Sequence, residues 1–254
     1  CTVSRYILQR LKQAGVDHLF GVPGDYVLDF LDEVLASPVR WAGTCNELNA
    51  GYAADGYARM KGLGGAVVTF GVGGLSILNA VAGAFAEQVP LVVVSGAPPA
   101  RRREAGARVH HLVDTYQLQL DVYRKITAAA TILTDPETAP DEIDRVLAAC
   151  IARKLPGYVE LPADMAGKPC RAPDPDWRPA APVSDPAQLA AAVAEAAARF
   201  DRAEHPLALV GMELARQRLG PDALRLVETV EIPFASMLSS KSLLPEFHPQ
   251  FVGI

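Results

Sequence analysis

Four side chains able to exchange protons near neutral pH mark the sequence: Asp25, Glu47, His110 and His111. Glu47 lies near the start of TCNELNAGYAADGYAR (44–59), where small residues recur at helical spacing and predict a helix. A partly desolvated carboxylate at a helix start suits proton exchange with a nitrogen atom of a ligand. Alternatively, this acid only complements the helix dipole.

Asp25 ends the stretch GVPGD (21–25), which follows a predicted strand at 18–22. Parallel sheets place their sites directly after such strands. We expect Gly24 to allow an unusual backbone conformation, and Asp25 is either a helix N-cap or a site residue. A second glycine-rich stretch, GVGG (71–74), matches neither GxGxxG nor the P-loop, so a tight strand-to-helix turn is favoured over a phosphate cradle.

His110 and His111 are adjacent in the long segment 96–116, which is predicted to be a loop, and the chain has only three other histidines. Imidazoles titrate near neutral pH, so the pair places exchangeable protons where a substrate can reach them. A surface pair without function is the alternative. No third ligand is spaced to complete a metal site, and no metal-binding residue is predicted.

Apolar runs alternate with helical patterns through the first 165 residues. Because the runs lack polar alternation, we predict an α/β fold, a parallel sheet with helices on both faces. Sites in such sheets lie beyond the carboxyl ends of the strands. The predicted strands are 18–22, 39–45, 66–70, 91–95, 126–133 and 158–161, and helices are expected at 47–59 and 75–86 among others.

The domain organisation follows from a proline-rich stretch without periodicity. We predict a first domain over 1–165, a linker over 166–185, and the start of a second, truncated α/β domain over 186–254. Asp185 is expected to cap the first helix of the second domain, and a further helix is expected over 214–230. The predicted buried face of the first of these helices consists of Leu189, Val193, Ala197 and Phe200.

Composition excludes several classes of protein. The chain has 254 residues, half of them hydrophobic, and a net charge of −5, so it is globular and nucleic acid is not an expected partner. The arginines at 101–103 are typical of a solvated loop. The uncharged stretch 62–86 is broken by glycines and polar residues, so it predicts a buried strand, turn and helix rather than a membrane span. Cys45 and Cys150 are expected to be buried thiols, and with no signal peptide evident a cytoplasmic location is expected.

The order of the motifs is more specific than any one of them. GVPGD, NEL with GYAADGYAR, VTFGVGGLSILNAVAGAFAEQVPLVVVSGAP and the HH pair together resemble the pyrimidine-binding domain of thiamine-diphosphate-dependent 2-oxo acid decarboxylases. The similarity to pyruvate, indolepyruvate and phenylpyruvate decarboxylases runs from Thr2 to about Met165. It continues into their middle domain through HPLALVG and IPFASMLSSKSLLPEFHPQFVGI, and so covers nearly the whole chain.

The resemblance implies a role for each site residue. Glu47 matches the glutamate that hydrogen-bonds the aminopyrimidine ring and promotes the tautomer that removes the thiazolium C2 proton. The family's acid-base group, which handles the substrate carboxylate, the departing CO2 and protonation of the enamine, is matched by Asp25, His110 and His111. The positions that contact the pyrimidine are matched by Val22, Pro23 and Thr69.

The same resemblance implies non-oxidative decarboxylation of a 2-oxo acid to an aldehyde and CO2. It implies thiamine diphosphate and Mg as cofactors, with the diphosphate and metal ligands in a C-terminal domain absent from this sequence. A homodimer or homotetramer and an inactive isolated fragment are expected. The stretch LVDTYQLQLDVYRKIT lacks the Gly-Asp segment of pyruvate decarboxylases, which favours an aryl-pyruvate over pyruvate. The alternatives are an acetolactate-synthase-like carboligase and a non-catalytic cofactor-binding or dimerising fragment.

Overall fold

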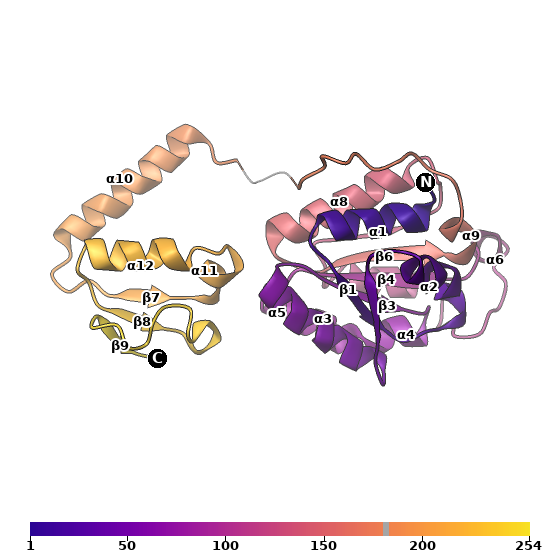
Figure 1. The fold of residues 1–254 in the computed structure, drawn as a ribbon, viewed down its shortest axis with the longest axis horizontal. Coiled ribbons are helices and arrows are strands. Elements are labelled where there is room, and N and C mark those ends of the chain that lie inside the picture. The colour runs from indigo at the N-terminus through magenta and orange to yellow at the C-terminus, as the bar shows by residue number, and fades with distance from the viewer. Residues whose placement is uncertain (180–182) are drawn as a thin grey trace. The chain divides into compact units, whose positions relative to one another are not determined.

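The computed structural model describes residues 1–179 and 183–254. The chain divides into two compact units, Cys1–Ala180 and Ala181–Ile254, and each contains its own parallel sheet (Figure 1). Within the described residues, none of the helices has both the length and the apolar character that a membrane crossing requires.

The first unit is built on a six-stranded sheet in which every neighbouring pair is parallel. The strand order is β2-β1-β3-β4-β6-β5, so the predicted α/β fold class is confirmed. The uncharged stretch 62–86 forms a strand followed by two helices, where one helix was predicted. The strands are β1 (His18–Gly21), β2 (Arg40–Gly43), β3 (Gly64–Val68), β4 (Leu91–Ala97), β5 (Ala129–Ile132) and β6 (Gly157–Pro162).

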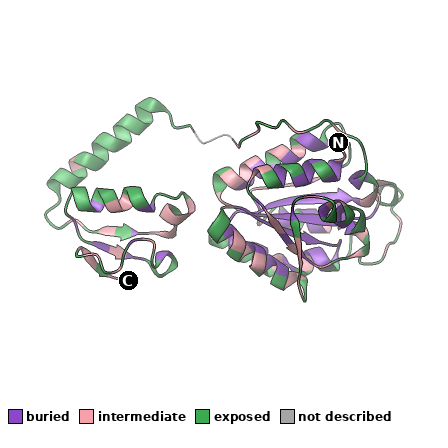
Figure 2. Cartoon of the chain, in the orientation of Figure 1, coloured by how far each residue is buried: buried purple, intermediate pink, exposed green. Residues whose placement is uncertain are grey.

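Helices cover both faces of this sheet because successive strand residues point to opposite sides. Val67 and Val94 belong to one buried cluster, together with residues of α1, α2 and α8. Val68 and Val93 belong to another, together with residues of α3, α5 and α7. The central strands β3 and β4 are therefore buried on both faces (Figure 2). The helices are α1 (Val3–Gln13), α2 (Leu28–Leu35), α3 (Glu47–Lys61), α5 (Leu78–Ala86), α7 (Leu118–Tyr123) and α8 (Ala139–Arg153).

A buried arginine joins α1 to α8. Arg10 is 2% exposed, and its Nε lies 2.7 Å from Oδ1 of Asp144. The same guanidinium donates to Oε1 of Gln13 and to the main-chain oxygen of Asp174, each at 2.8 Å. Because Asp174 follows the last strand of this unit, the proline-rich segment is attached to the unit at that point.

Several predicted helix and loop boundaries are wrong, because the local residue pattern does not show where a helix is interrupted. The helix expected over 75–86 is two helices, α4 (Val72–Ser76) and α5, and Ile77 separates them. Residues 96–116 are not all loop, because β4 extends to Ala97 and α6 (Ala100–Glu104) follows. The helix expected over 214–230 divides into α11 (Met212–Arg216) and α12 (Gly220–Thr229), and Pro221 favours a new helix start.

The second unit has a three-stranded sheet, β7 (Ala208–Val210), β8 (Phe234–Ser236) and β9 (Phe251–Gly253), with a small buried cluster. The helix α10 (Pro186–Arg202) begins as predicted, since Asp185 accepts from the N–H of Gln188 at 2.8 Å. Its predicted burial is wrong (Figure 2), because α10 has no buried residue. Sequence periodicity shows which side chains share a helix face but does not supply the surface that covers them. The large apolar residues of that face, Leu189, Val193 and Phe200, are all exposed.

The cysteines also differ from expectation in one case. Cys150 is buried as predicted, and burial raises the pKa of its thiol. Cys45 is exposed, so the prediction of a buried thiol is wrong there. The reason is that β2 ends at Gly43, and Cys45 lies in the connection to α3 rather than in a buried strand.

Candidate active site

The order of the strands reverses at the carboxyl edge of the first sheet, the place where open α/β sheets form their ligand-binding crevice. The chain passes from β1 to β2 on one side and returns to β3 on the other side of β1. Such a reversal is where open α/β sheets bind ligands. Residues 22–25 follow β1, the start of α3 follows β2, residues 69–74 follow β3, and the segment 98–116 follows β4.

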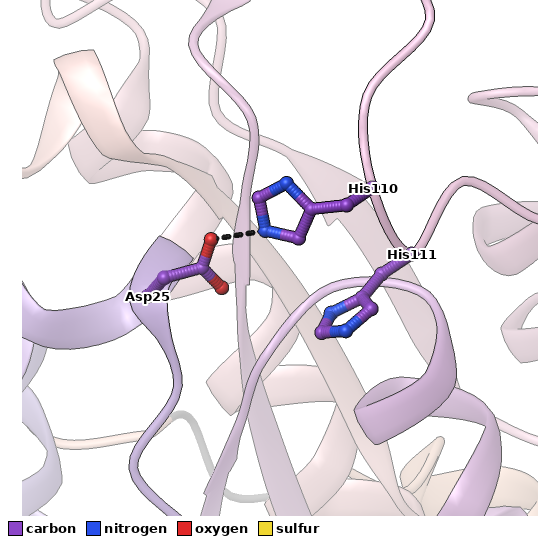
Figure 3. Close-up of side chains that lie close together, drawn as sticks. All are labelled: Asp25, His110 and His111. Atoms are coloured by element: carbon purple, nitrogen blue, oxygen red, sulfur yellow. Dashed lines mark hydrogen bonds and ion pairs between the residues drawn. The ribbon is translucent and has the colours of Figure 1, made fainter.

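The structure brings Asp25, His110 and His111 together at this edge (Figure 3). Nε2 of His110 hydrogen-bonds the Asp25 carboxylate. The hydroxyl of Tyr26 lies 3.3 Å from Nδ1 of His110, and the two rings stack with centroids 4.9 Å apart. Asp25 begins the 3-10 helix η1 (Asp25–Val27), and no side chain caps that helix, so the N-cap interpretation of Asp25 is wrong.

No residue near the two histidines in the sequence is spaced to be a third metal ligand. The fold, however, brings the Asp25 carboxylate next to them. Single ligand atoms of Asp25, His110 and His111 all lie within 4.8 Å of one another. All three residues are exposed, and one imidazole nitrogen already pairs with the carboxylate. The arrangement is thus a carboxylate that orients an imidazole, with a second imidazole adjacent, which is suited to moving protons.

Glu47 is the first residue of α3, but another side chain caps this helix. Asn46 is the N-cap, and its side chain accepts from the N–H of Asn49 at 2.9 Å. The Glu47 carboxylate is half-buried and forms no hydrogen bond or ion pair within 1–179 and 183–254. Its Oε1 would lie 3.4 Å from a Cβ at Gly73, so glycine at position 73 keeps a side chain from crowding the carboxylate.

Thr69 lies next to the same space. It is 7% exposed, and its hydroxyl is buried without a hydrogen-bond partner among the described residues. A Cβ at Gly24 would come within 2.4 Å of the Thr69 Cβ, and one at Gly73 within 2.9 Å of its Cγ2. Gly24 has an ordinary extended φ of −148°, so the expectation of an unusual backbone there is wrong. Glycine is needed at this position for close approach.

The remaining residues expected to bind cofactor lie on the connection from β1. Val22 is half-buried, and its N–H donates to the main-chain oxygen of Val67 at 3.4 Å, which holds it beside β3. Pro23 is exposed. These residues lie near the unpartnered Glu47 carboxylate, the orphaned Thr69 hydroxyl and two glycines. Together they fit a flat ring that carries hydrogen-bonding nitrogens.

The turn 71–74 supports the histidine segment. Gly71 has a φ of +65°, and a Cβ there would lie 1.7 Å from the main-chain oxygen of His111. Its N–H donates to Oε1 of Gln119 at 2.7 Å. The connection from β3 is therefore tight, as the sequence favours, but the helix α4 already begins at Val72, and Gly71 also contacts the backbone of a site residue.

Gly71→Ala is expected to lower the free energy of unfolding by about 1–3 kcal/mol, because alanine is strained at that φ and meets the His111 carbonyl. Urea unfolding measures the change. Gly56→Ala is the matched control, since Gly56 lies within α3 and a Cβ there meets nothing within 4 Å. That change is expected to stabilise by about 0.5–1 kcal/mol. Equal effects of the two changes would contradict the prediction.

Sequence reasoning missed a buried polar network beneath the site. Gln119 donates from Nε2 to the hydroxyls of Ser95, at 2.9 Å, and Tyr158, at 2.6 Å. Tyr158 in turn donates to Glu160, whose side chain is fully buried. The signal was present in the sequence, because a lone carboxylate within the apolar strand GYVELP requires a partner.

A cavity of about 390 Å³ adjoins His110. Among the described residues, Arg101, Arg102 and Arg108 of its lining form no ion pair, so the cavity has an uncompensated positive charge. This arrangement attracts small anions. The cavity is lined by Tyr26, Pro98, Pro99, Arg101, Arg102, Arg108, Val109 and His110.

Comparison with known proteins agrees with this geometry. Residues 1–121 match the N-terminal TPP binding domain of thiamine pyrophosphate enzymes, and residues 193–254 match their central domain. The fold is therefore that of a cofactor-binding α/β domain, and the chain belongs to the thiamine pyrophosphate enzyme family.

Within this family, the chain is similar to several decarboxylases. The chain is 39% identical to an alpha-keto-acid decarboxylase of Mycobacterium leprae and 39% identical to a pyruvate decarboxylase of Aspergillus parasiticus. It is 41% identical to an alpha-keto-acid decarboxylase of Mycobacterium avium. These alignments cover 99–100% of this chain but 44–45% of the relatives, so the chain spans less than half of their length.

Proposed function

We propose that this chain supplies the pyrimidine half of the active site of a thiamine-diphosphate-dependent 2-oxo acid decarboxylase. The reaction releases CO2 and an aldehyde. The observation that carries the proposal is the unpartnered Glu47 carboxylate next to Gly73, near the orphaned hydroxyl of Thr69. The names of the relatives support this reaction class.

Glu47, Thr69, Val22 and Pro23 would bind the cofactor's aminopyrimidine ring. When bound, the cofactor supplies the electron sink for the carbanion left by the departing CO2. The Glu47 carboxyl would hold a proton at a ring nitrogen, because no other described group competes for it. The glycines at positions 24 and 73 let Thr69 pack close to the backbone, which fixes its hydroxyl beside Glu47.

Asp25, His110 and His111 would exchange protons with the reacting carbon. The Asp25 carboxylate fixes the orientation of the His110 ring, and Tyr26 supports the opposite nitrogen and one ring face. Imidazole is a side chain that can both donate and accept protons, so a positioned ring can serve both steps. The arginine-lined cavity would hold the anionic 2-oxo acid before it reaches this group.

The wider assignment rests on the family resemblance. It comprises Mg as the second cofactor, a homodimer or homotetramer, a cytoplasmic location, and an aryl-pyruvate or pyruvate as substrate. The domains we assign are 1–165 for pyrimidine binding, 166–185 for the linker and 186–254 for the middle domain.

The test uses the complete protein that the gene encodes, assayed with thiamine diphosphate and Mg. Pyruvate, phenylpyruvate and indolepyruvate are supplied separately, and aldehyde, CO2 and acetolactate are measured. We expect aldehyde and CO2 from at least one 2-oxo acid. Acetolactate as the main product would instead indicate a carboligase, and no product from any acid would indicate a non-catalytic module. Either outcome contradicts the proposal.

Replacing Arg101, Arg102 and Arg108 together by Gln is expected to raise KM for the 2-oxo acid about tenfold with little change in kcat, because the cavity loses its positive charge. The effect should shrink in high salt, which screens exposed charges. The matched control replaces Lys125, Lys168 and Arg202, which are exposed and outside this cavity, by Gln. A similar KM increase in the control would show that only net charge matters.

A further inference from the structure

One arginine, Arg103, connects the two ends of the segment that contains both histidines. Arg103 lies in α6, ahead of the histidines, and its Nη2 donates to the main-chain oxygen of Tyr116 at 3.0 Å and to Oε1 of Gln117 at 3.1 Å. Both acceptors follow the histidines in the chain. One guanidinium therefore joins the two ends of the segment 104–115.

A buried carboxylate anchors the same arginine to the sheet. Nη1 of Arg103 lies 3.0 Å from Oε1 of Glu160, whose side chain is 0% exposed. Tyr158 donates to the other oxygen of Glu160 at 2.8 Å. Burial raises the pKa of the Glu160 carboxyl, while Tyr158 and Arg103 act in the opposite direction. Since Glu160 lies on β6, paired with β4 at Ser95, the anchor is a rigid element.

The histidine segment needs such an anchor. His111 and Asp114 have φ values of +64° and +59°, which are unfavourable for residues other than glycine. The pair between His110 and Asp25 is exposed on both sides, and exposed ion pairs hold a geometry only weakly. The buried contact of Arg103 with Glu160 is much less screened by solvent.

We propose that Arg103 and Glu160 form a clasp that positions His110 and His111 against Asp25. Both are positioning residues, because neither belongs to the group of side chains that faces the crevice. The clasp itself follows from the contacts of Arg103 alone. Its effect on turnover rests on the proposed function.

The test variant is Arg103→Lys in the complete protein. Lysine keeps a positive charge opposite Glu160, so no buried carboxylate is left unpaired, but a single ammonium cannot reproduce the fork that spans three acceptors. We expect kcat to fall at least tenfold while KM stays within threefold. We also expect trypsin to cleave after the exposed Arg108 at least ten times faster under native conditions.

The matched control is Arg10→Lys. Arg10 bonds the same three kinds of acceptor, a carboxylate, a glutamine amide and a main-chain oxygen, but it joins α1 to α8 instead of holding the histidine segment. We expect this change to lower thermal stability at least as much as Arg103→Lys without changing kcat or cleavage after Arg108. A second variant, Arg103→Gln with Glu160→Gln, removes both charges together and is expected to reproduce the loss of kcat.

Three results would overturn the inference. The first is unchanged cleavage after Arg108 in Arg103→Lys. The second is faster cleavage with unchanged kcat, which would show a loop restraint without a role in the reaction. The third is an equal loss of kcat in Arg10→Lys, which would show general destabilisation. If the unmodified protein decarboxylates no 2-oxo acid, the proposed function fails, and the clasp is then judged by proteolysis alone.

Discussion

Glu47→Gln is expected to lower kcat by about 10³-fold while the free energy of unfolding changes by less than about 0.5 kcal/mol. The amide keeps the volume of the side chain but cannot give and reclaim a proton. Folding should be insensitive to the change because Asn46, not Glu47, caps α3, and because the carboxylate has no ion pair within the described residues. Steady-state kinetics with the complete protein and urea unfolding measure the two effects.

Two further measurements make this prediction specific to the site. Binding of thiamine diphosphate, followed by fluorescence quenching, should weaken less than kcat falls, since the amide still offers a hydrogen-bonding group. Glu137→Gln is the control, because Glu137 is exposed ahead of α8 and lies outside the crevice. If Glu47→Gln retained more than a tenth of the original kcat, the assignment of Glu47 as the proton-exchanging group would be wrong.

Asp25→Asn and His110→Ala are each expected to reduce kcat by about 10²-fold to 10⁴-fold, and the double variant by no more than the larger single effect. The reason is that the carboxylate acts through the ring it orients, so removing both groups removes one function. A double-mutant cycle on kcat measures this coupling. His111→Ala, analysed in the same cycle with Asp25→Asn, reports whether the second imidazole acts with the pair or separately.

The control for this cycle is His248→Ala, because His248 belongs to the second unit and pairs there with Glu228. Its combination with Asp25→Asn should be additive. Fully additive losses for Asp25→Asn and His110→Ala would mean that the two residues act independently, in spite of the hydrogen bond between them. That result would contradict the acid-base group described here.

Sequence determined the parts of the fold that depend on neighbouring residues. Apolar runs without polar alternation identified a parallel sheet covered on both faces, because burial on both faces removes the need for polar side chains. Capping chemistry placed the start of α10 after Asp185. The order of the motifs identified the family, because GVPGD, NEL and GVGG lie at the carboxyl ends of successive strands, where the fold needs special backbone or charge.

Tertiary structure alone decided how distant residues meet. Asp25 and His110 are 85 positions apart, and only the strand order brings their connections to one edge. Glycine is required at 24 and 73 because the Thr69 side chain packs against both positions. The helix α10 is exposed because no other described element packs on its apolar face. The sequence shows Glu160 as a carboxylate within an apolar strand, but it does not identify Arg103 as the partner. Long-range pairing depends on the path of the whole chain and not on local pattern.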